Sequence, residues 1–403
     1  MKKMMKTVLI ATLLLIVGGM LVAPVSAATT WINTSKYADN NYSSVVNWAN
    51  LTYQEMNATL PKAYSNGPVY MQGPTFDPAD PYGTAGQNMI NFYGHNGTYV
   101  RNLTDLAGGM AAGDELKIQS SDSFAVYFGA DDVNTPEAHQ GNLVVSWWDS
   151  DMGLVPGYYY GMRLFFYNPQ STYGFNDDLN LTLVEMRDNF DPWYRSNYTN
   201  IDGTWPSAKG LSSKYVQYLK IYPPHRHDFN TTGDTTGAAF MYQTSGLPTT
   251  PDDPSDAFAT TSAIADDDGT FKSDVTDTEE CYAAHRFNFS IDTSTTKDGP
   301  IADIEKLNVT WNGKGWHDTP GNNGTDLYIY DFTASSYGSA LASTSYGTEQ
   351  TLTGEITSGI SNYVNSGNVT VLVKQKSPHN EFDEASHLST DYVKLVVTHH
   401  HSN

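Results

Sequence analysis

Short segments in which apolar and polar residues alternate recur through most of this chain. The alternation is clear in DELKIQSSDSFAVYFGADDV (114–133), GNLVVSWWDSDMG (141–153) and SKYVQYLKIYPP (213–224), and later in IEKLNVTWNG (304–313) and DYVKLVVT (391–398). Alternation with period two is typical of strands that bury one face. Strands this short, separated by Gly, Asp, Asn and Pro, predict a mainly β protein with small helices.

Changes in this pattern divide the chain into segments. They are a signal peptide (1–27), an extended N-terminal arm (28–68), a β-rich domain (69–229), a linker (230–256), an antiparallel β-sandwich (257–398) and a tail (399–403). The linker is predicted because Thr, Asp, Gly and Pro replace the apolar periodicity there. The sandwich, of jelly-roll type, is predicted because short antiparallel strands follow one another through its whole length.

The most apolar stretch after the first thirty residues is GYYYGMRLFFYNP (157–169). Tyr158, Tyr160 and Met162 fall on one parity, and Tyr159 and Arg163 fall on the other. Such a run is more typical of a strand buried in a sheet than of a binding surface. We expect one face to pack into the core of the first domain, whereas Arg163 and the remaining tyrosines are placed to line the other face.

The first 27 residues have the features of a secretory signal peptide in the usual order. Lys2, Lys3 and Lys6 precede an apolar stretch (8–22), and the small residues Val-Ser-Ala (25–27) follow it. A membrane helix needs about 20 apolar residues, and no second apolar stretch of that length follows. We therefore expect a secreted protein without a membrane span, located at the cell surface or in the cell envelope.

The chain is strongly acidic and contains a single cysteine. It has 22 Lys+Arg and 44 Asp+Glu, and cleavage of the signal peptide would leave 19 against 44, a net charge of −25. Such a charge repels nucleic acid, which we exclude as a partner. Because Cys281 is alone, no intramolecular disulfide is possible, and stability has to come from burial of a core.

Asn-x-Ser/Thr sequences occur about twice as often as the composition alone would give. In an exported chain they predict a surface protein that carries N-linked glycans. The acceptor asparagines are Asn33, Asn41, Asn50, Asn57, Asn96, Asn102, Asn180, Asn197, Asn230, Asn288, Asn308, Asn323 and Asn368.

Acidic residues concentrate in two short segments in and after the predicted linker. PDDPSD contributes Asp252 and Asp253, and ADDDGT contributes Asp266, Asp267 and Asp268. Oxygen ligands at this density suit Ca²⁺, although no Glu closes a twelve-residue EF-hand loop. A solvated acidic loop is the alternative, and we expect no other cofactor.

Two groups of histidines are candidate metal ligands. His225 and His227 lie two residues apart beside Asp228, a pattern able to hold Zn²⁺. Because no fourth ligand is near in the sequence, we favour an exposed strand end. Residues 399–401 are three histidines at the end of the chain, where they would bind metal only loosely.

Aromatic residues alternate along two predicted strands of the second domain. Trp311, Trp316, Tyr328 and Tyr330 would either face a sugar ring or, as is more common, be buried, and we favour burial. The chain contains no His-Glu-x-x-His, no Gly-x-Ser-x-Gly and no glycine-rich phosphate loop with Lys-Ser/Thr. We therefore do not expect an enzyme.

Three motifs of the first domain resemble the molybdopterin-binding fold of sulfite-oxidase-type enzymes. SDSF (121–124) stands at a turn between paired strands, GMRL (161–164) at an Arg-Leu strand, and VQYLKI (216–221) at a closing strand. Members of that family hold molybdenum through a cysteine thiolate of this domain, whereas Cys281 lies in the other domain. The resemblance therefore implies a scaffold without the cofactor, similar to domains in secreted proteins of archaea, particularly methanogens.

The second domain resembles the jelly-roll modules of archaeal and bacterial surface proteins, through residues such as 307–311, 327–332 and 369–373. The whole chain is similar to subunits of archaeal surface layers or sheaths. The resemblance implies a structural protein of the cell envelope that assembles with copies of itself into a homopolymer. A carbohydrate-binding surface protein is the alternative, and a redox enzyme on the first domain is the least favoured.

Overall fold

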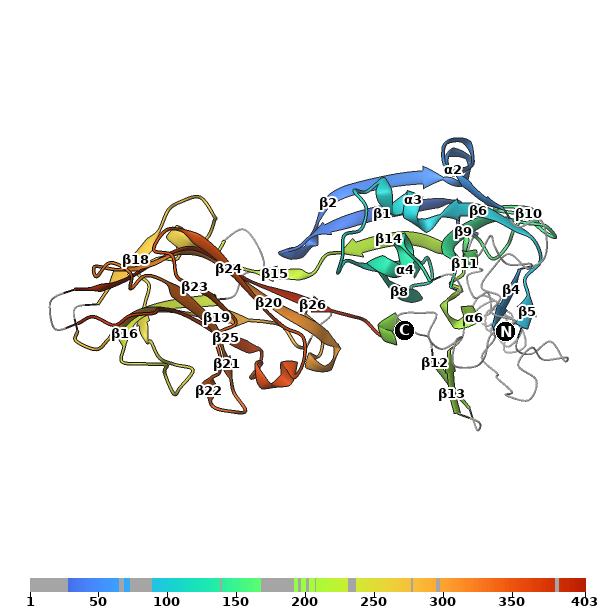
Figure 1. Ribbon diagram of the computed structural model, residues 1–403. Coiled ribbons are helices and arrows are strands. Elements are labelled where there is room, and N and C mark those ends of the chain that lie inside the picture. Colours follow the sequence, from blue (N-terminus) through green and yellow to red (C-terminus); the bar gives the residue numbers. More distant parts are fainter. Residues whose placement is uncertain are drawn as a thin grey trace, which may run out of the picture.

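Figure 1 shows a computed structural model of the chain, which forms two lobes joined by β15 (His225–His227). The described residues are 28–64, 69–72, 89–137, 140–167, 192–194, 197–200, 203–206, 208–230, 237–276, 278–294, 298–380 and 384–403. Strands account for 48% and helices for 11%, so the predicted mainly β class is confirmed. Among the described residues, no helix is both long and apolar enough to cross a membrane. The predicted signal peptide lies outside them.

The N-terminal lobe is built on two sheets. The first has the order β2-β1-β14-β7-β8, with strands β1 (Trp31–Ala38), β2 (Asn41–Thr52), β7 (Glu115–Ser120), β8 (Ala125–Gly129) and β14 (Val216–Tyr222). The second has the order β10-β9-β6-β3, with β11 also paired to β9, and its strands are β3 (Lys62–Tyr64), β6 (His95–Tyr99), β9 (Asn142–Asp149), β10 (Gly153–Leu154) and β11 (Arg163–Tyr167).

Smaller elements complete this lobe. They are the hairpins β4 (Tyr70–Gln72) with β5 (Met89–Asn91) and β12 (Asn197–Asn200) with β13 (Gly203–Pro206), and the helices α2 (Tyr53–Thr59), α3 (Val100–Asp105), α4 (Ala130–Asn134), η1 (Pro192–Tyr194) and α6 (Ala208–Leu211). Helix α2 begins where the sequence dictates, because Thr52 and Glu55 form a reciprocal capping box. A single buried cluster joins both sheets and includes Ile32, Ile118 and Phe165.

Residues 31–52 form two strands of the first sheet and residues 62–64 form a strand of the second, so the prediction of an extended arm is wrong. Strand β1 lies inside the sheet, parallel to β14 on one side and antiparallel to β2 on the other. Ile32 and Thr34 are buried, whereas six consecutive residues of β2 are exposed. The segment looks too polar for a domain because two of the three buried residues of β1, Thr34 and Ser35, are polar and β2 lies at the sheet edge.

The C-terminal lobe is a β-sandwich of two antiparallel sheets. One contains β15, β18 (Lys272–Val275), β20 (Ile304–His317), β24 (Gln350–Ile356) and β26 (Ser386–His399). The other contains β16 (Gly237–Thr244), β17 (Asp256–Ala257), β19 (Tyr282–Ser290), β21 (Thr325–Asp331), β22 (Ser336–Tyr337), β23 (Ala342–Thr344) and β25 (Asn368–Gln375). Short 3-10 turns η2 (Ser262–Ile264), η3 (Ile301–Asp303) and η4 (Ile360–Asn362) connect strands. One buried cluster lies between the sheets, and the assignment as a jelly roll stays a prediction.

Two predicted boundaries of the C-terminal lobe need correction. The predicted linker contains β16, which pairs with β19 along its whole length, so the sandwich begins earlier than residue 257. The tail is not free either: the backbone N–H and Nδ1 of His401 lie 2.7 and 2.6 Å from the Glu115 carboxylate of the N-terminal lobe. Figure 1 shows the end of the chain lying against that lobe. Both corrections concern contacts of the backbone or of the tail. Such contacts produce no alternation of apolar and polar residues, so the sequence pattern does not reveal them.

Candidate functional site

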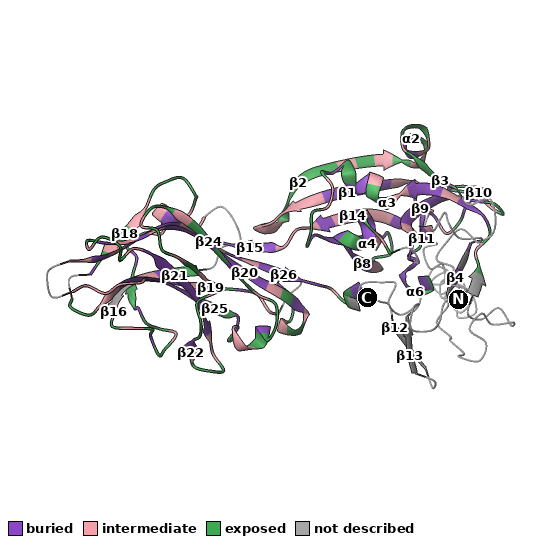
Figure 2. Cartoon of the chain, viewed as in Figure 1, coloured by how far each residue is buried: buried purple, intermediate pink, exposed green. Residues whose placement is uncertain are grey.

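The two edges of the first sheet differ. Strand β2 is the outermost strand at one edge, and among the described residues nothing pairs with its outer side. Figure 2 shows its exposure, and the side chains of Val45, Val46 and Trp48 are 44%, 61% and 64% exposed. The segment from Asn41 to Thr52 contains no charge and no proline, which are common protections of an edge strand. This edge is therefore open to pairing with another strand.

The opposite edge, β8, is closed by the end of the chain. The Tyr127 N–H donates to Asn403 Oδ1 at 2.7 Å, and Asn403 Nδ2 donates to the Tyr127 carbonyl at 2.9 Å. The His401 ring also stacks on the Tyr127 ring, with 4.5 Å between ring centroids. The side chain of Asn403 thus occupies the hydrogen-bonding position that a neighbouring strand would take.

A pocket of about 600 Å³ opens in the N-terminal lobe. It is lined by residues of four segments, among them Asn91, Tyr93, Asp151, Tyr159, Lys209 and Lys214, and at its inner end by His95, Tyr158 and Arg163. This volume falls within the range of about 300–1,000 Å³ that is usual for small-molecule sites. Tyr93 has a φ of +64°, which is uncommon for a residue with a side chain and is typical of functional sites.

Arg163 occupies the inner wall of this pocket in a fixed orientation. Its Nε donates to Ser212 Oγ at 2.9 Å, and Ser212 Oγ donates to the Leu164 carbonyl at 2.6 Å. The guanidinium lies over the Phe92 ring, 4.4 Å from its centroid. Burial lowers the pKa of Arg163, because the charged form loses its hydration.

His95 supports the pocket as a neutral group. Its Nε2 donates to the Phe92 carbonyl at 2.6 Å, and its Nδ1 lies 3.1 Å from Ser146 Oγ. Burial lowers the pKa of His95 to about 3. The approach of its Nε2 to the Asp149 carboxylate, 3.5 Å, is therefore not an ion pair at neutral pH.

The apolar stretch at 157–169 is in part a buried strand and in part the lining of the pocket. Tyr158 and residues 163–166 are buried, so the expected buried strand is confirmed for the described part, which ends at Tyr167. Tyr158, Tyr159 and Tyr160 also line the pocket with Arg163. The pocket comes from the turn before β11, which brings the tyrosines back over the start of that strand.

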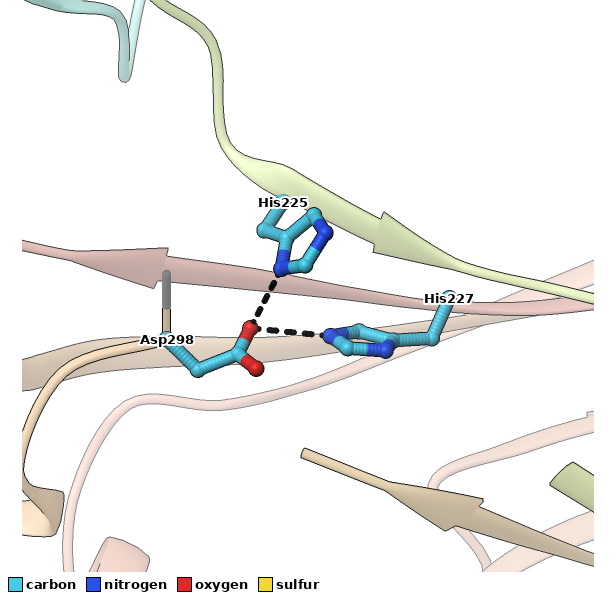
Figure 3. A group of neighbouring side chains, drawn as sticks. All are labelled: His225, His227 and Asp298. Carbon is cyan, nitrogen blue, oxygen red and sulfur yellow. Dashed lines mark hydrogen bonds and ion pairs between the residues drawn. The ribbon is translucent and has the colours of Figure 1, made fainter. Parts of the chain in front are cut away.

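His225 and His227 are buried and meet Asp298, which lies 71 residues beyond His227 (Figure 3). His225 Nδ1 and His227 Nε2 lie 2.7 and 2.8 Å from Asp298 Oδ1. The prediction of an exposed strand end is therefore wrong. Asp228, the expected neighbour, contacts Arg226 and Tyr392 instead. No pattern in the sequence points to Asp298.

This His–Asp–His cluster fits two interpretations. Two imidazole nitrogens and one carboxylate oxygen, all within 4.8 Å of one another, are a donor set suited to Zn²⁺. The same atoms also form a hydrogen-bonded clamp, in which the Asp292 N–H donates to the second carboxylate oxygen at 2.6 Å. Burial opposes ionisation of Asp298, but the hydrogen bonds from His225 and His227 outweigh it and hold its pKa well below the usual range. Either way, the cluster fixes β15 to the C-terminal lobe.

The five carboxylates predicted to bind Ca²⁺ do not meet at one point. Among the described residues, Asp267 is grouped with Glu349 and Asp391 instead. Asp266 accepts from Asn230 Nδ2 at 2.9 Å, Asp268 accepts from the Thr270 N–H at 2.8 Å, and Asp253 accepts from Thr250 Oγ1 at 3.1 Å. Asp252 is exposed in the same loop as Asp253. Calcium binding itself stays a prediction.

The predicted glycosylation sites are accessible to different degrees. Among the described asparagines of the Asn-x-Ser/Thr sequences, no side chain is buried, and Asn50 and Asn368 are exposed. Asn308 Nδ2, the atom to which a glycan would be attached, donates to Glu355 at 2.7 Å. Asn180 lies outside the described residues, and the side chain of Asn197 is not described. We rank Asn50 and Asn368 as the best acceptors.

Most of the aromatic residues considered for sugar binding in the C-terminal lobe are core residues. Trp311 is fully buried, and its Nε1 donates to Thr390 Oγ1 at 2.8 Å. Tyr328 and Tyr330 are buried as well, whereas Trp316 is partly exposed and stacks on His387. The expected burial is confirmed for Trp311, Tyr328 and Tyr330, so these three rings are not available to stack on a sugar.

Comparison with known proteins places the C-terminal lobe but not the N-terminal lobe. Residues 234–399 match a family described as "Uncharacterized protein, C-terminal domain", which is named after an archaeal protein. The matched residues begin just before β16 and end with β26, so the match covers the sandwich. No curated protein matched the chain.

Proposed function

We propose that this chain is a secreted, N-glycosylated structural protein of the cell envelope that assembles with copies of itself through β2. The observation that carries the proposal is the open edge of the first sheet: a twelve-residue, uncharged strand with Val46 and Trp48 exposed. An unprotected strand edge offers a row of unpaired N–H and C=O groups to a neighbour.

A second copy of this chain is the partner that fits this edge. Copies of so acidic a protein repel one another, so a contact between them has to avoid carboxylates, and β2 has none. The other edge of the same sheet is occupied by Asn403. We therefore propose an antiparallel contact of β2 with β2 of the next copy, related by a twofold axis. A head-to-tail contact of β2 with β8 would first require release of the tail.

The sequence resemblances support the same proposal. Three features of the sequence favour a location outside the cell. They are the signal-like N-terminus, the excess of glycosylation sequences, and the resemblance to surface-layer or sheath subunits and to jelly-roll modules. Asn41 and Asn50 flank the exposed part of β2, so glycans on them would border this contact without covering Val46. The resemblance of the first domain to a molybdopterin-binding scaffold remains part of this proposal.

The test is the oligomeric state of residues 28–403, measured by light scattering and electron microscopy over a range of protein, salt and Ca²⁺ concentrations. We expect dimers, because a twofold contact closes at two copies, and we expect Val46→Lys to shift them to monomers because an edge lysine opposes strand pairing. Tyr346→Lys is the matched control, since Tyr346 is equally exposed but lies in the C-terminal lobe. A wild-type protein that stayed monomeric in every condition would overturn the proposal.

A further inference from the structure

The pocket in the N-terminal lobe holds three cations without carboxylate partners. Among the described residues, no carboxylate lies within ion-pair distance of Arg163, Lys209 or Lys214. This is unusual in a chain with twice as many acidic as basic residues. Arg163 is only 4% exposed, and a buried charge without a counter-ion is costly.

The second cation lies at the side of the pocket. Lys214 Nζ lies 4.1 Å from the centroid of the Tyr160 ring, and the guanidinium of Arg163 lies 5.7 Å from the same centroid. Burial, followed by repulsion from Arg163, lowers the pKa of Lys214. Two positive groups facing one ring raise the local potential, and an anion between them would relieve it.

The other residues that line the pocket indicate which group would lie beside the anion. Tyr158, Tyr159 and Tyr160 form a continuous aromatic wall, with 4.0 Å between the ring centroids of Tyr159 and Tyr160. Apolar C–H faces of sugar rings pack against such rings, while Asn91 and Asp151 are available to their hydroxyl groups. Asp149 and Asp151 also line the pocket, so the lining suits a singly charged carboxylate better than a doubly charged phosphate.

We propose that this pocket binds a carboxylate-bearing sugar, a uronate unit of an acidic glycan. The carboxylate lies between Arg163 and Lys214, and the sugar ring packs against Tyr159 and Tyr160. This activity goes beyond self-assembly and does not depend on it, because the pocket and β2 lie on different strands of the N-terminal lobe. It gives the envelope protein a means to hold an acidic polysaccharide.

The test compares two probes by calorimetry with residues 28–403: trigalacturonate and the same trisaccharide with its carboxylates reduced to hydroxymethyl groups. We expect the uronate to bind at least tenfold more tightly. Lys214→Met and Tyr159→Ala should each weaken uronate binding at least fivefold. Both side chains are exposed, so these variants are expected to fold.

Lys117→Met and Tyr346→Ala are the controls and should leave binding unchanged, because neither residue lines the pocket. Equal binding of the two trisaccharides, no binding of either, or unchanged binding by Lys214→Met would overturn the proposal. Inorganic phosphate that bound as tightly as the uronate would overturn the assignment to a sugar carboxylate. Because assembly is measured separately with Val46→Lys, failure of one proposal is distinguishable from failure of the other.

Discussion

Each lobe buries an arginine over a phenylalanine ring, but the two arginines differ in the acceptors that surround them. In the C-terminal lobe, Arg286 donates to the carbonyls of Pro254 and Pro251 at 2.7 and 2.6 Å and to Asn288 Oδ1 at 3.2 Å. In the N-terminal lobe, Arg163 donates through Nε to the hydroxyl of Ser212 and faces a pocket. Burial of a charge is therefore no sign of a site by itself; the set of acceptors around it distinguishes a structural arginine from one placed for a ligand.

The same contrast holds for backbone groups. One sheet of the sandwich ends at the edge strand β24, which carries the charged Glu355, whereas the first sheet of the N-terminal lobe ends at β2, which carries no charge. The uncharged edge strand and the pocket thus both lie in the N-terminal lobe, and the C-terminal lobe leads into the tail that closes β8.

The largest effect is expected when the core of the C-terminal lobe is broken. Trp311→Ala should cost about 3–5 kcal/mol of the unfolding free energy of that lobe, because it leaves a cavity and removes one of the two side-chain hydrogen bonds of Thr390 Oγ1. Denaturant unfolding measures this cost, with the partly exposed Trp316→Ala as the control. Uronate binding should persist in the variant under folding conditions, and its loss would contradict the separation of roles between the lobes.

The two arginines should respond differently to the same substitution. Arg286→Met leaves buried backbone carbonyls without donors, so we expect a loss of about 2–3 kcal/mol. Arg163→Met removes a buried charge that has no ion pair with a described carboxylate, so stability should stay within about 1 kcal/mol of the wild type or increase. Thermal and denaturant unfolding of both variants test this pair. Equal losses would show that Arg163 is as structural as Arg286.

Acid should destabilise the C-terminal lobe more steeply than the N-terminal lobe. Burial lowers the pKa of His285 to about 3 and of His399 to about 4 in the C-terminal lobe, and of His95 to about 3 in the N-terminal lobe. The unfolded chain takes up protons near pH 6.5 and the folded chain does not, so this stability is complete above pH 6.5 and is lost as the pH falls towards 4.

Each such histidine contributes a slope of up to about 1.4 kcal/mol per pH unit in this window, so two of them double the slope of the C-terminal lobe. Denaturant unfolding at a series of pH values, with a probe in each lobe, measures the two slopes. His285→Gln should halve the slope of the C-terminal lobe and leave that of the N-terminal lobe unchanged. An unaltered slope in this variant would rule out His285 as a source.

The smallest effect on stability is expected at the closed edge of the first sheet. Asn403→Ala removes the side-chain hydrogen bonds to Tyr127 and should cost about 1 kcal/mol or less. It should nevertheless change assembly, because an open β8 allows β2 of another copy to pair head-to-tail. Electron microscopy should show longer, fibre-like assemblies, and adding Val46→Lys should abolish them. Assemblies identical to those of the wild type would mean that the tail does not control this edge.

Much of the architecture follows from the sequence, because side chains in strands alternate between two faces. This period revealed β7, β8, β20 and β26 and identified the mainly β class. It also identified the stretch before and within β11 as buried, since an apolar run of that length is stable only inside a sheet. Strands without this period were not predicted. Strand β16 pairs with β19 through backbone hydrogen bonds, which impose no pattern on the side chains. Strand β2 lies at a sheet edge, where most of its residues are exposed.

The sequence by itself determined the alternating strands, the acidic charge, the lone cysteine and the candidate residue types, because each of these depends on local composition or on spacing within one strand. Only the tertiary structure decided which of those residues meet. Asp298 contacts His225 and His227, the nearer of which is 71 residues away in the sequence. Asn403 contacts Tyr127, which is 276 residues away. Lys214 and Arg163 lie near the same Tyr160 ring. Such meetings depend on strand order and register between distant segments, which are set by packing of the whole core and leave no mark on neighbouring residues.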